Sequence, residues 1–292
     1  IKDGKKLWSH AVNGKAYGLA ASDGRLFVST DTGQVYSFRA GVGPGKPSDP
    51  SIVENETGSD GAAAQTAAAV DDEHLIGRWV FQPSKVEGKT LRNLAGGRPG
   101  QLAVAKQFEQ VGSRQALVFD GSQQSVLISP SHRQAKVPRK TMSTSAWVRV
   151  DEPQTWGGLI GAVQDNGDFE RGWILGFRDS KFSFALAGAE GNGRLTYLTA
   201  KDDFQLRHWH HVAATYDGTT MSLFVDGKLS AASTAQKGDI HYPPSAFYEI
   251  GAYHDNDENH RLTGALHEVR VYDDVLTAEE IAAQHRELAD DF

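Results

Sequence analysis

The chain has 292 residues, of which 39% are hydrophobic and 23% are charged, an ordinary composition for a folded protein. Its formal net charge of -7 argues against nucleic acid as a partner, because phosphate binding needs clustered Lys and Arg. Cysteine is absent, which excludes disulfides, Cys-ligated zinc and thiol catalysis. No run of about 18 apolar residues occurs, so we expect no insertion into a membrane.

The first 73 residues divide into two parts by composition. Residues 1–40 contain short apolar runs separated by Asp-Gly or Thr-Gly pairs at 3–4, 23–24 and 32–33, which predicts a β-meander of about three strands. Residues 41–73 are rich in Gly, Pro and then Ala, with few large apolar side chains. This composition predicts a flexible linker.

Residues 74–292 are predicted to form one all-β domain. Strand-like runs are separated by Gly, Asp, Asn and Pro, and no helical pattern of about ten residues lies between them. The expected strands are 75–81, 115–119, 125–128, 141–150, 158–163, 172–177, 181–186, 208–216, 221–225, 247–253 and 264–272. This pattern predicts an antiparallel sandwich of two sheets, a jelly roll.

One helix is expected near the end of the sequence. Thr277 has the character of an N-cap, and Glu280 stands three residues later as its capping-box partner. Ile281 and Leu288 share one face of the helix that follows. We therefore expect a short helix packed on the sandwich.

The sequence HWHH at 208–211 raises the question of a metal site, because histidine is a common zinc ligand. Alternate residues of a strand face opposite sides, so His208 and His210 share one face and His211 lies on the other. The hairpin that follows supplies no third ligand on the face of the pair. We therefore predict that these histidines belong to the strand architecture.

Several motifs in this region resemble a known family when taken together. WHHVAATYDG, LFVDGKL, IGAY and LTGALHEVRVYDDVLTAEEI follow in order, after GRWVF, ALVFDGSQQSV and SAWVRV. They resemble the laminin-G-like, concanavalin A-like jelly-roll modules of exported bacterial proteins, over about residues 74–289. The earlier DGKKLW and GRLFVSTDTGQVYSF resemble one blade of a quinoprotein-type β-propeller, over about residues 1–40.

The resemblance implies a binding module for a polysaccharide or other glycan, inside a larger extracytoplasmic protein that is periplasmic, cell-surface or secreted. Related modules also bind proteins, which leaves a protein-interaction or spacer role open. Hydrolases of the same fold carry E-x-D-x-E or E-x-D-x-x-E on one strand, and no such run occurs here. The nearest acids are Asp168 with Glu170 and Asp255 with Asp257. We therefore expect no enzyme activity, and a glycoside hydrolase that uses such an unfamiliar acid pair stays as a weaker alternative.

Calcium is a second implication of the resemblance, because related modules often bind this ion. Their last long strand carries an acidic ligand where this chain has His267, and Gln82 and Pro83 replace acids common after the first strand. These departures weaken the usual site. Oxygen ligands at alternate positions offer another candidate calcium site, and these are Asp255, Asp257 and Asn259.

A glycan site needs aromatic rings beside hydrogen-bonding groups. Trp79, Trp147 and Trp209 lie in strand patterns and are expected in the core, whereas Trp156 is expected in a Pro- and Gly-flanked loop. Tyr253 leads into a polar segment. We predict a recognition rim formed by Trp156, Tyr253, His254, Asp255, Asp257 and Arg261.

Overall fold

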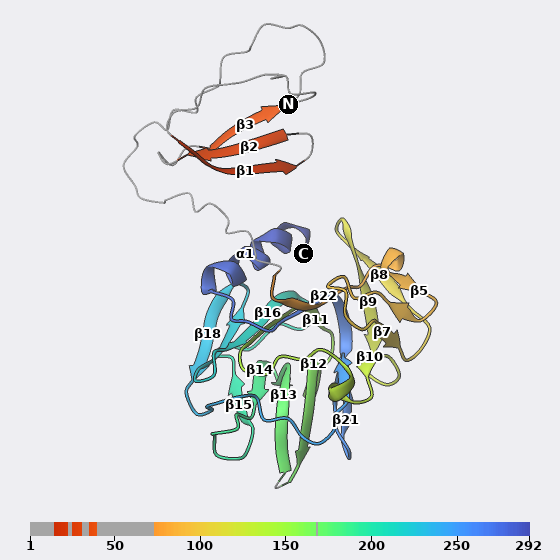
Figure 1. Cartoon of the computed structure of the whole chain (residues 1–292). Coiled ribbons are helices and arrows are strands. Elements are labelled where there is room, and N and C mark those ends of the chain that lie inside the picture. The colour runs from red at the N-terminus through yellow and green to blue at the C-terminus, as the bar shows by residue number, and fades with distance from the viewer. Residues whose placement is uncertain (1–14, 23–24, 31–34, 40–72, 168) are drawn as a thin grey trace, which may run out of the picture. The chain divides into compact units, whose positions relative to one another are not determined.

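The computed structural model describes residues 15–22, 25–30, 35–39, 73–167 and 169–292. The chain divides into two compact units, Ile1–Ala63 and Ala64–Phe292. In the first unit, β1 (Ala16–Ser22), β2 (Arg25–Thr30) and β3 (Val35–Arg39) form an antiparallel meander in that order (Figure 1). The three strands agree with the predicted meander, and the propeller-blade likeness stays a prediction. The predicted turns at 3–4, 23–24 and 32–33, and linker residues 41–72, lie outside the described residues.

The second unit is built from two antiparallel sheets. The larger sheet contains β15 (Thr196–Thr199), β14 (Lys181–Leu186), β13 (Phe169–Asp179), β12 (Gln154–Asn166), β19 (Tyr248–Ile250), β10 (Val126–Ser129), β7 (Gly100–Leu102), β6 (Thr90–Leu91) and β5 (Val86–Glu87), in this spatial order. The smaller contains β18 (Lys228–Ser233), β17 (Met221–Val225), β16 (Trp209–Tyr216), β11 (Met142–Val150), β22 (Thr263–Tyr272), β9 (Arg114–Asp120) and β8 (Phe108–Val111), with β4 (Leu75–Val80) also paired to β22. The predicted jelly-roll sandwich is confirmed.

The main hydrophobic core lies between these two sheets. Strand alternation supplies it: Val212, Ala214 and Tyr216 of β16 point inward, as do Trp173 and Leu175 of β13. The short 3₁₀ helices Pro83–Lys85, His132–Gln134 and Ala289–Asp291 lie outside the sheets. Large fully buried rings fill the centre of this core, including those of Trp79, Trp173, Tyr216 and Tyr248.

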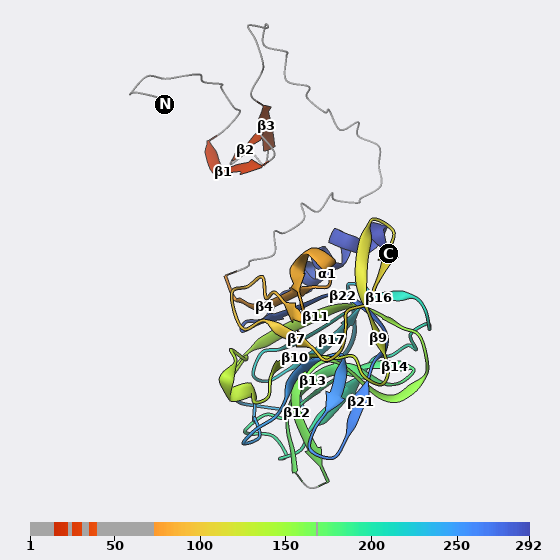
Figure 2. The same cartoon turned by 90° about the vertical axis from the view of Figure 1, so that its right-hand side faces the viewer.

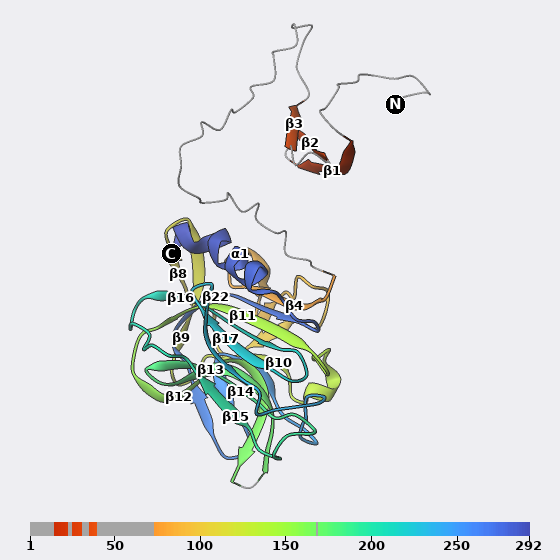
Figure 3. The same ribbon diagram turned by 90° about the vertical axis from the view of Figure 1, so that its left-hand side faces the viewer.

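Helix α1 (Ala278–Leu288) covers the outer face of the smaller sheet. Its N-terminus carries the predicted capping box, in which Thr277 and Glu280 bond each other's backbone N–H groups. Ile281 joins Ala213, Phe224 and Tyr272 in a second apolar cluster beneath the helix. Figures 2 and 3 show α1 beside β22 and β11, away from β12.

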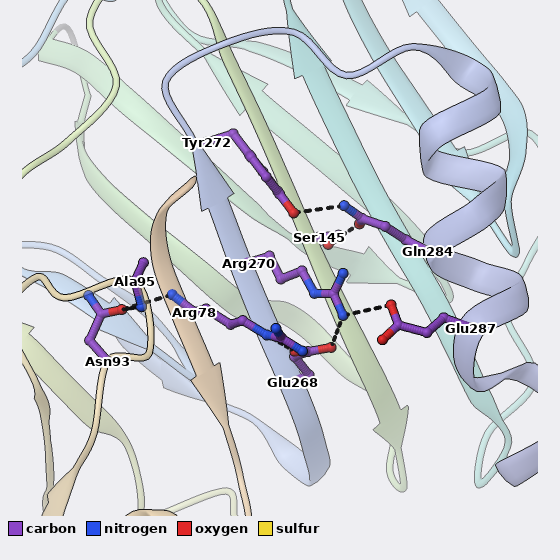
Figure 4. Close-up of polar contacts among 9 residues, drawn as sticks. All are labelled: Arg78, Asn93, Ala95, Ser145, Glu268, Arg270, Tyr272, Gln284 and Glu287. Carbon is purple, nitrogen blue, oxygen red and sulfur yellow. Dashed lines mark hydrogen bonds and ion pairs between the residues drawn. The ribbon is translucent and has the colours of Figure 1, made fainter. Parts of the chain in front are cut away.

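Buried polar groups fix the helix to the sheet (Figure 4). The Gln284 side chain accepts a bond from Ser145 Oγ at 2.9 Å and donates to the Tyr272 hydroxyl at 3.0 Å. Arg270 pairs with Glu287 of the helix at 2.9 Å and with Glu268 at 2.8 Å. Burial raises the pKa of Glu268, but the nearby guanidinium groups outweigh it and hold that pKa below its ordinary value. These contacts hold α1 against the smaller sheet.

The histidines of the HWHH segment agree with the predicted architectural role. His210 Nδ1 bonds Asp226 at 2.9 Å at the edge of the core, whereas His211 is buried on the opposite face against Trp147. His208 lies just before the strand and is exposed. In the described part of the chain, no group of three or more His, Cys, Asp or Glu side chains has metal-site geometry.

The predicted positions of the tryptophans were right only in part. Trp79 is in the core as expected. Trp147 is buried, but it lies beneath α1 and stacks on His285 at a centroid distance of 5.6 Å. Trp209 is half-buried, with its ring 4.6 Å from that of Phe292. Because alternation places both Trp147 and Trp209 on outward-facing positions, strand membership alone did not put them in the core.

The predicted strand 247–253 is wrong as one strand, because the chain bends at Gly251. β19 ends at Ile250 within the larger sheet, and β20 (Ala252–His254) pairs instead with β21 (Asn259–Arg261). Gly251 has φ of +78°, and a Cβ there would stand 2.2 Å from the Phe119 ring. Only glycine fits both the backbone angle and this space. The bend directs the β20–β21 hairpin out of the sheet.

Acid is expected to destabilise the fold through His211. Burial, and then the charges of His285 and Arg270, lower the pKa of His211 to about 3. In the unfolded chain this histidine has its ordinary pKa of about 6.5. Between about pH 6.5 and 3 the unfolded chain therefore binds a proton that the folded chain does not bind, and the free energy of unfolding falls as the pH falls through this range. Between pH 7 and pH 5 the loss is about 2 kcal/mol.

The test compares urea unfolding of the wild type and His211→Phe at these two pH values. The variant should lose about 2 kcal/mol less than the wild type on acidification, because its ring does not titrate. His208→Phe, an exposed position next to the same strand, should behave as the wild type does. Equal losses in the wild type and His211→Phe would contradict the prediction.

Candidate functional site

The candidate site lies on the outer face of the larger sheet, over strands β12 to β15 (Figure 1). Inward residues of these strands belong to the main core, whereas outward residues join a separate small cluster. Cross-strand register aligns outward residues in rows, and one row consists of Gly161, Ile174, Ala185 and Tyr197. Most outward residues here are small, so the larger rings stand out from the sheet.

Three aromatic rings meet on this face. The Trp156 ring of β12 lies 5.3 Å from that of Tyr197 on β15 and 5.5 Å from that of Tyr253 on β20. Tyr253 is only 2% exposed, whereas Trp156 and Tyr197 are half-buried. A ligand on this face would therefore meet the rings of Trp156 and Tyr197, with Tyr253 beneath them as support.

A carboxylate orders the two tyrosines. Asp165 Oδ2 accepts hydrogen bonds from the hydroxyls of Tyr197 at 2.5 Å and Tyr253 at 2.9 Å, and the two hydroxyl oxygens are 2.8 Å apart. Burial, and then the bond to Asp165, raise the pKa of Tyr197 well above its ordinary value. Burial and the neighbouring Tyr197 and Asp165 do the same for the pKa of Tyr253. Both hydroxyls are protonated at neutral pH and serve as donors.

Charged groups occupy the opposite ends of the cluster. The guanidinium carbon of Arg178 lies 4.7 Å from the centre of the Trp156 ring, a cation–π contact. At the other end, Asp165 is directly opposite Glu170 across the β12–β13 pair. Glu170 accepts the backbone N–H of Leu195 at 2.9 Å and contacts Arg194 at 3.4 Å. The face thus presents a cation at the Trp156 end and carboxylates at the other.

The β20–β21 hairpin holds Tyr253 in place. A Cβ on Gly158 would stand 2.0 Å from the carbonyl oxygen of Ala252, so the hairpin backbone lies directly against β12. The hairpin turn is ordered by Asp255, which accepts the backbone N–H groups of Asp257 at 3.1 Å and Glu258 at 2.8 Å. Asp255 also accepts the N–H of Asp165 at 3.0 Å, which ties the turn to β12.

The hairpin divides the predicted recognition rim. Tyr253 faces Trp156, whereas His254 lies on the opposite side of the hairpin, where its Nδ1 contacts Glu249 at 2.6 Å. Arg261 shares the side of His254 and donates to the carbonyl oxygen of Gln123 and to Ser125 Oγ, both at 2.8 Å. The structure therefore brings two of the rim residues together, and places His254 and Arg261 elsewhere.

The predicted calcium ligands do not converge well. Asp255 is 2% exposed, and both of its oxygens accept backbone N–H groups. Asp257 and Asn259 are exposed, and Asp257 contacts the Asn166 amide. The calcium site stays a prediction that these contacts do not favour. At the usual site of related modules, His267 is buried and its Nδ1 donates to the Gln115 carbonyl at 2.7 Å.

Two features of this face differ from the sequence prediction. Trp156 was expected in a loop, but β12 begins at Gln154 and includes it. The adjoining Pro153 and Gly157 misled the prediction, because this strand carries register shifts on both sides of Trp156 and accommodates them. Tyr197 was missed because its four-residue strand follows a Gly-rich segment. The alternation TYLT was the signal that could have found it.

The two packed antiparallel sheets, with aromatic rings on one outer face, define a jelly-roll sandwich domain. The family model Laminin_G_3, described as the concanavalin A-like lectin/glucanases superfamily, matches residues 120–282. The chain belongs to this superfamily.

Curated relatives match only part of this chain. Pappalysin-1 of Mus musculus is 25% identical over 159 residues, which are 51% of this chain and 10% of the relative. The human protein of the same name is 25% identical over 157 residues, 50% of this chain and 10% of the relative. The match therefore spans about a tenth of the length of these relatives.

Solved structures with the same fold include carbohydrate-active proteins. A sialidase of Trypanosoma rangeli in complex with 2,3-difluorosialic acid aligns with a TM-score of 0.54 and 18% identity, over 75% of this chain and 34% of that chain. Domain 4 of AbnA, an extracellular arabinanase of Geobacillus stearothermophilus, in complex with arabinotriose, aligns with a TM-score of 0.50 and 15% identity, over 71% of this chain and 96% of that one. At these identities the likeness shows the fold.

The close contact at Gly158 should be essential for the hairpin. Gly158→Ala forces the Ala252 carbonyl to move, and we expect a loss of about 1–3 kcal/mol in the free energy of unfolding. Amide hydrogen exchange over residues 251–263 should accelerate, because the hairpin no longer lies against β12. Thr199→Val, an exposed position on the same sheet, should change neither quantity. Unaltered exchange in Gly158→Ala would show that another contact holds the hairpin.

Proposed function

We propose that this domain is a non-catalytic carbohydrate-binding module that uses the outer face of β12 to β15. The observation that carries the proposal is the convergence of the half-buried rings of Trp156 and Tyr197 beside Asp165 and Arg178. Sugar rings stack their C–H faces on aromatic rings, while their hydroxyls bond to acids and guanidinium groups. Both kinds of group are present within one cluster.

The comparisons support this proposal at the level of the fold. The superfamily includes lectins and glucanases by its description, and the neighbouring structures include a sialidase and an arabinanase domain in complex with sugars. A fold does not determine a function, so the site must carry the argument. Among the described residues, no helix is long and apolar enough to cross a membrane. We place the domain in an extracytoplasmic protein, as such modules imply.

The carboxylates of this face support binding more than hydrolysis. Glycoside hydrolysis needs an acid and a second carboxylate free to act on the scissile bond. Asp165 accepts two tyrosine hydroxyls, and Glu170 accepts a backbone N–H and contacts Arg194. Of the acids weighed from sequence, Asp255 is engaged by the hairpin turn and Asp168 lies outside the described residues. We expect no release of reducing ends from any glycan that the domain binds.

A glycan-array screen tests the proposal, followed by titration of the best ligand. Trp156→Ala should weaken binding about fivefold or more, because the loss of one stacked ring removes about 1 kcal/mol or more of binding free energy. Trp209→Ala is the matched control, since this half-buried tryptophan lies on the other sheet and should leave binding unchanged. Equal binding by wild type and Trp156→Ala would move the site away from the aromatic cluster.

The same screen with calcium and with a chelator tests the predicted ion. Because both oxygens of Asp255 already accept backbone N–H groups, one set within the hairpin turn and one from Asp165, we expect equal binding in the two arms. Binding lost with the chelator and restored by calcium would establish a calcium site. Silence in every arm, combined with capture of a defined protein partner, would instead favour the protein-interaction role.

A further inference from the structure

Arg178 occupies an unusual position on the outer face. Register places it beside Trp156 of β12 on one side and directly opposite Lys181 of β14 on the other. Like charges directly opposite each other destabilise a sheet unless another group compensates them. Each of these two cations therefore needs a compensating group.

Lys181 has partners within the protein. Its ammonium donates to the carbonyl oxygen of Lys201 at 2.6 Å and pairs with Asp203 at 3.1 Å. The bond from Lys181 lowers the pKa of Asp203, in keeping with an ionised partner. The positive charge of Lys181 is therefore already compensated.

Arg178 differs from the other arginine of β13 and from Arg194 in the segment before β15. Arg171 donates to the backbone oxygens of Glu170 and Gly193, and Arg194 contacts the Glu170 carboxylate. Within the described residues, the guanidinium of Arg178 makes neither a hydrogen bond nor an ion pair. It is exposed and lies over the Trp156 ring. Its five N–H donors are left for solvent or for a ligand.

The chemistry of a guanidinium decides which ligand group fits. Its planar fork matches a carboxylate in two parallel charge-assisted hydrogen bonds, which a neutral sugar hydroxyl cannot reproduce. Stacking on Trp156 restricts the orientation of the fork. Asp165 and Glu170, which face each other at the other end of the cluster, repel an anion there. A ligand carboxylate is thus favoured at the Trp156 end alone.

We propose that the outer-face site takes carboxylated sugars and that Arg178 is the residue that recognises the carboxylate. This inference rests on the proposed function and narrows its ligand class. The apolar face of the sugar lies on the aromatic rings, and its carboxylate pairs with Arg178. Uronic acids and sialic acids share this chemistry, and the experiment distinguishes them.

The test compares glycans that have a free carboxylate with matched glycans in which the carboxylate is esterified or absent. One arm compares polygalacturonate, oligoglucuronates and oligomannuronates with their methyl esters, and a second compares sialyllactose with its methyl ester and with lactose. The wild type should bind the free acid of at least one pair at least tenfold more tightly than its ester. The arm that responds identifies the class of acid.

Variants separate the role of Arg178 from that of the site. Arg178→Gln should lose at least tenfold in affinity for the free acid and little for the ester, and Arg178→Lys should fall between, because it keeps the charge but not the fork. Arg133→Gln removes an exposed arginine from the 3₁₀ helix His132–Gln134 and should bind as the wild type does.

Two results would overturn the inference, and they have different consequences for the proposed function. Equal affinity for acid and ester, with Trp156→Ala weakening both, would keep carbohydrate binding and remove the role of Arg178. Absence of binding to every acid, ester and neutral glycan, by a protein whose far-UV circular dichroism shows it folded, would reject the proposed function together with the inference.

Discussion

The bend at Gly251 is the constraint on which the outer face of the larger sheet depends. β19 lies within the sheet, and one residue later the chain leaves it, because Gly251 adopts a positive φ against the Phe119 ring. The hairpin that follows can lie on β12 only where Gly158 has no side chain. Two glycines therefore place Tyr253 under Trp156 and Tyr197. Without this placement Trp156 and Tyr197 would still contact each other, but no third ring would lie beneath them.

Acidic residues in this domain serve largely to build turns. Asp255 orders the β20–β21 hairpin, and Asp120 accepts the backbone N–H groups of Ser122, Gln123 and Gln124. Burial raises the pKa of Asp120, but these three bonds outweigh it and lower the pKa to about 2. Loop segments with several Asp and Asn residues therefore look like ion sites in the sequence. In the structure, however, the carboxylates of Asp120 and Asp255 already accept backbone N–H groups.

Long strands and the helix cap were predictable from sequence, because their signals are local. Alternation in 208–216 and the Thr277–Glu280 box needed no knowledge of distant residues. The candidate site was harder to predict from the sequence. The structure brings the predicted residues Trp156 and Tyr253 together, and their partners Tyr197 and Asp165 come from positions that only the sheet register brings near them. His254 and Tyr253 are neighbours in sequence, but strand alternation sends them to opposite sides of the hairpin. Local pattern identifies such residues, and topology decides which of them meet.

The two outer faces of the sandwich differ in how their polar groups are satisfied. Beneath α1, the groups that hold the helix bond one another, and Gln284 bridges Ser145 and Tyr272 while Arg270 bridges Glu268 and Glu287. These hydrogen bonds and ion pairs join the helix to the sheet. On the opposite face, Asp165 accepts hydrogen bonds from the hydroxyls of Tyr197 and Tyr253. The guanidinium of Arg178 over Trp156, however, has no protein acceptor among the described residues. Because the exposed Arg178 guanidinium lies beside half-buried rings, the proposed recognition uses this second face, whereas the groups beneath α1 hold the fold together.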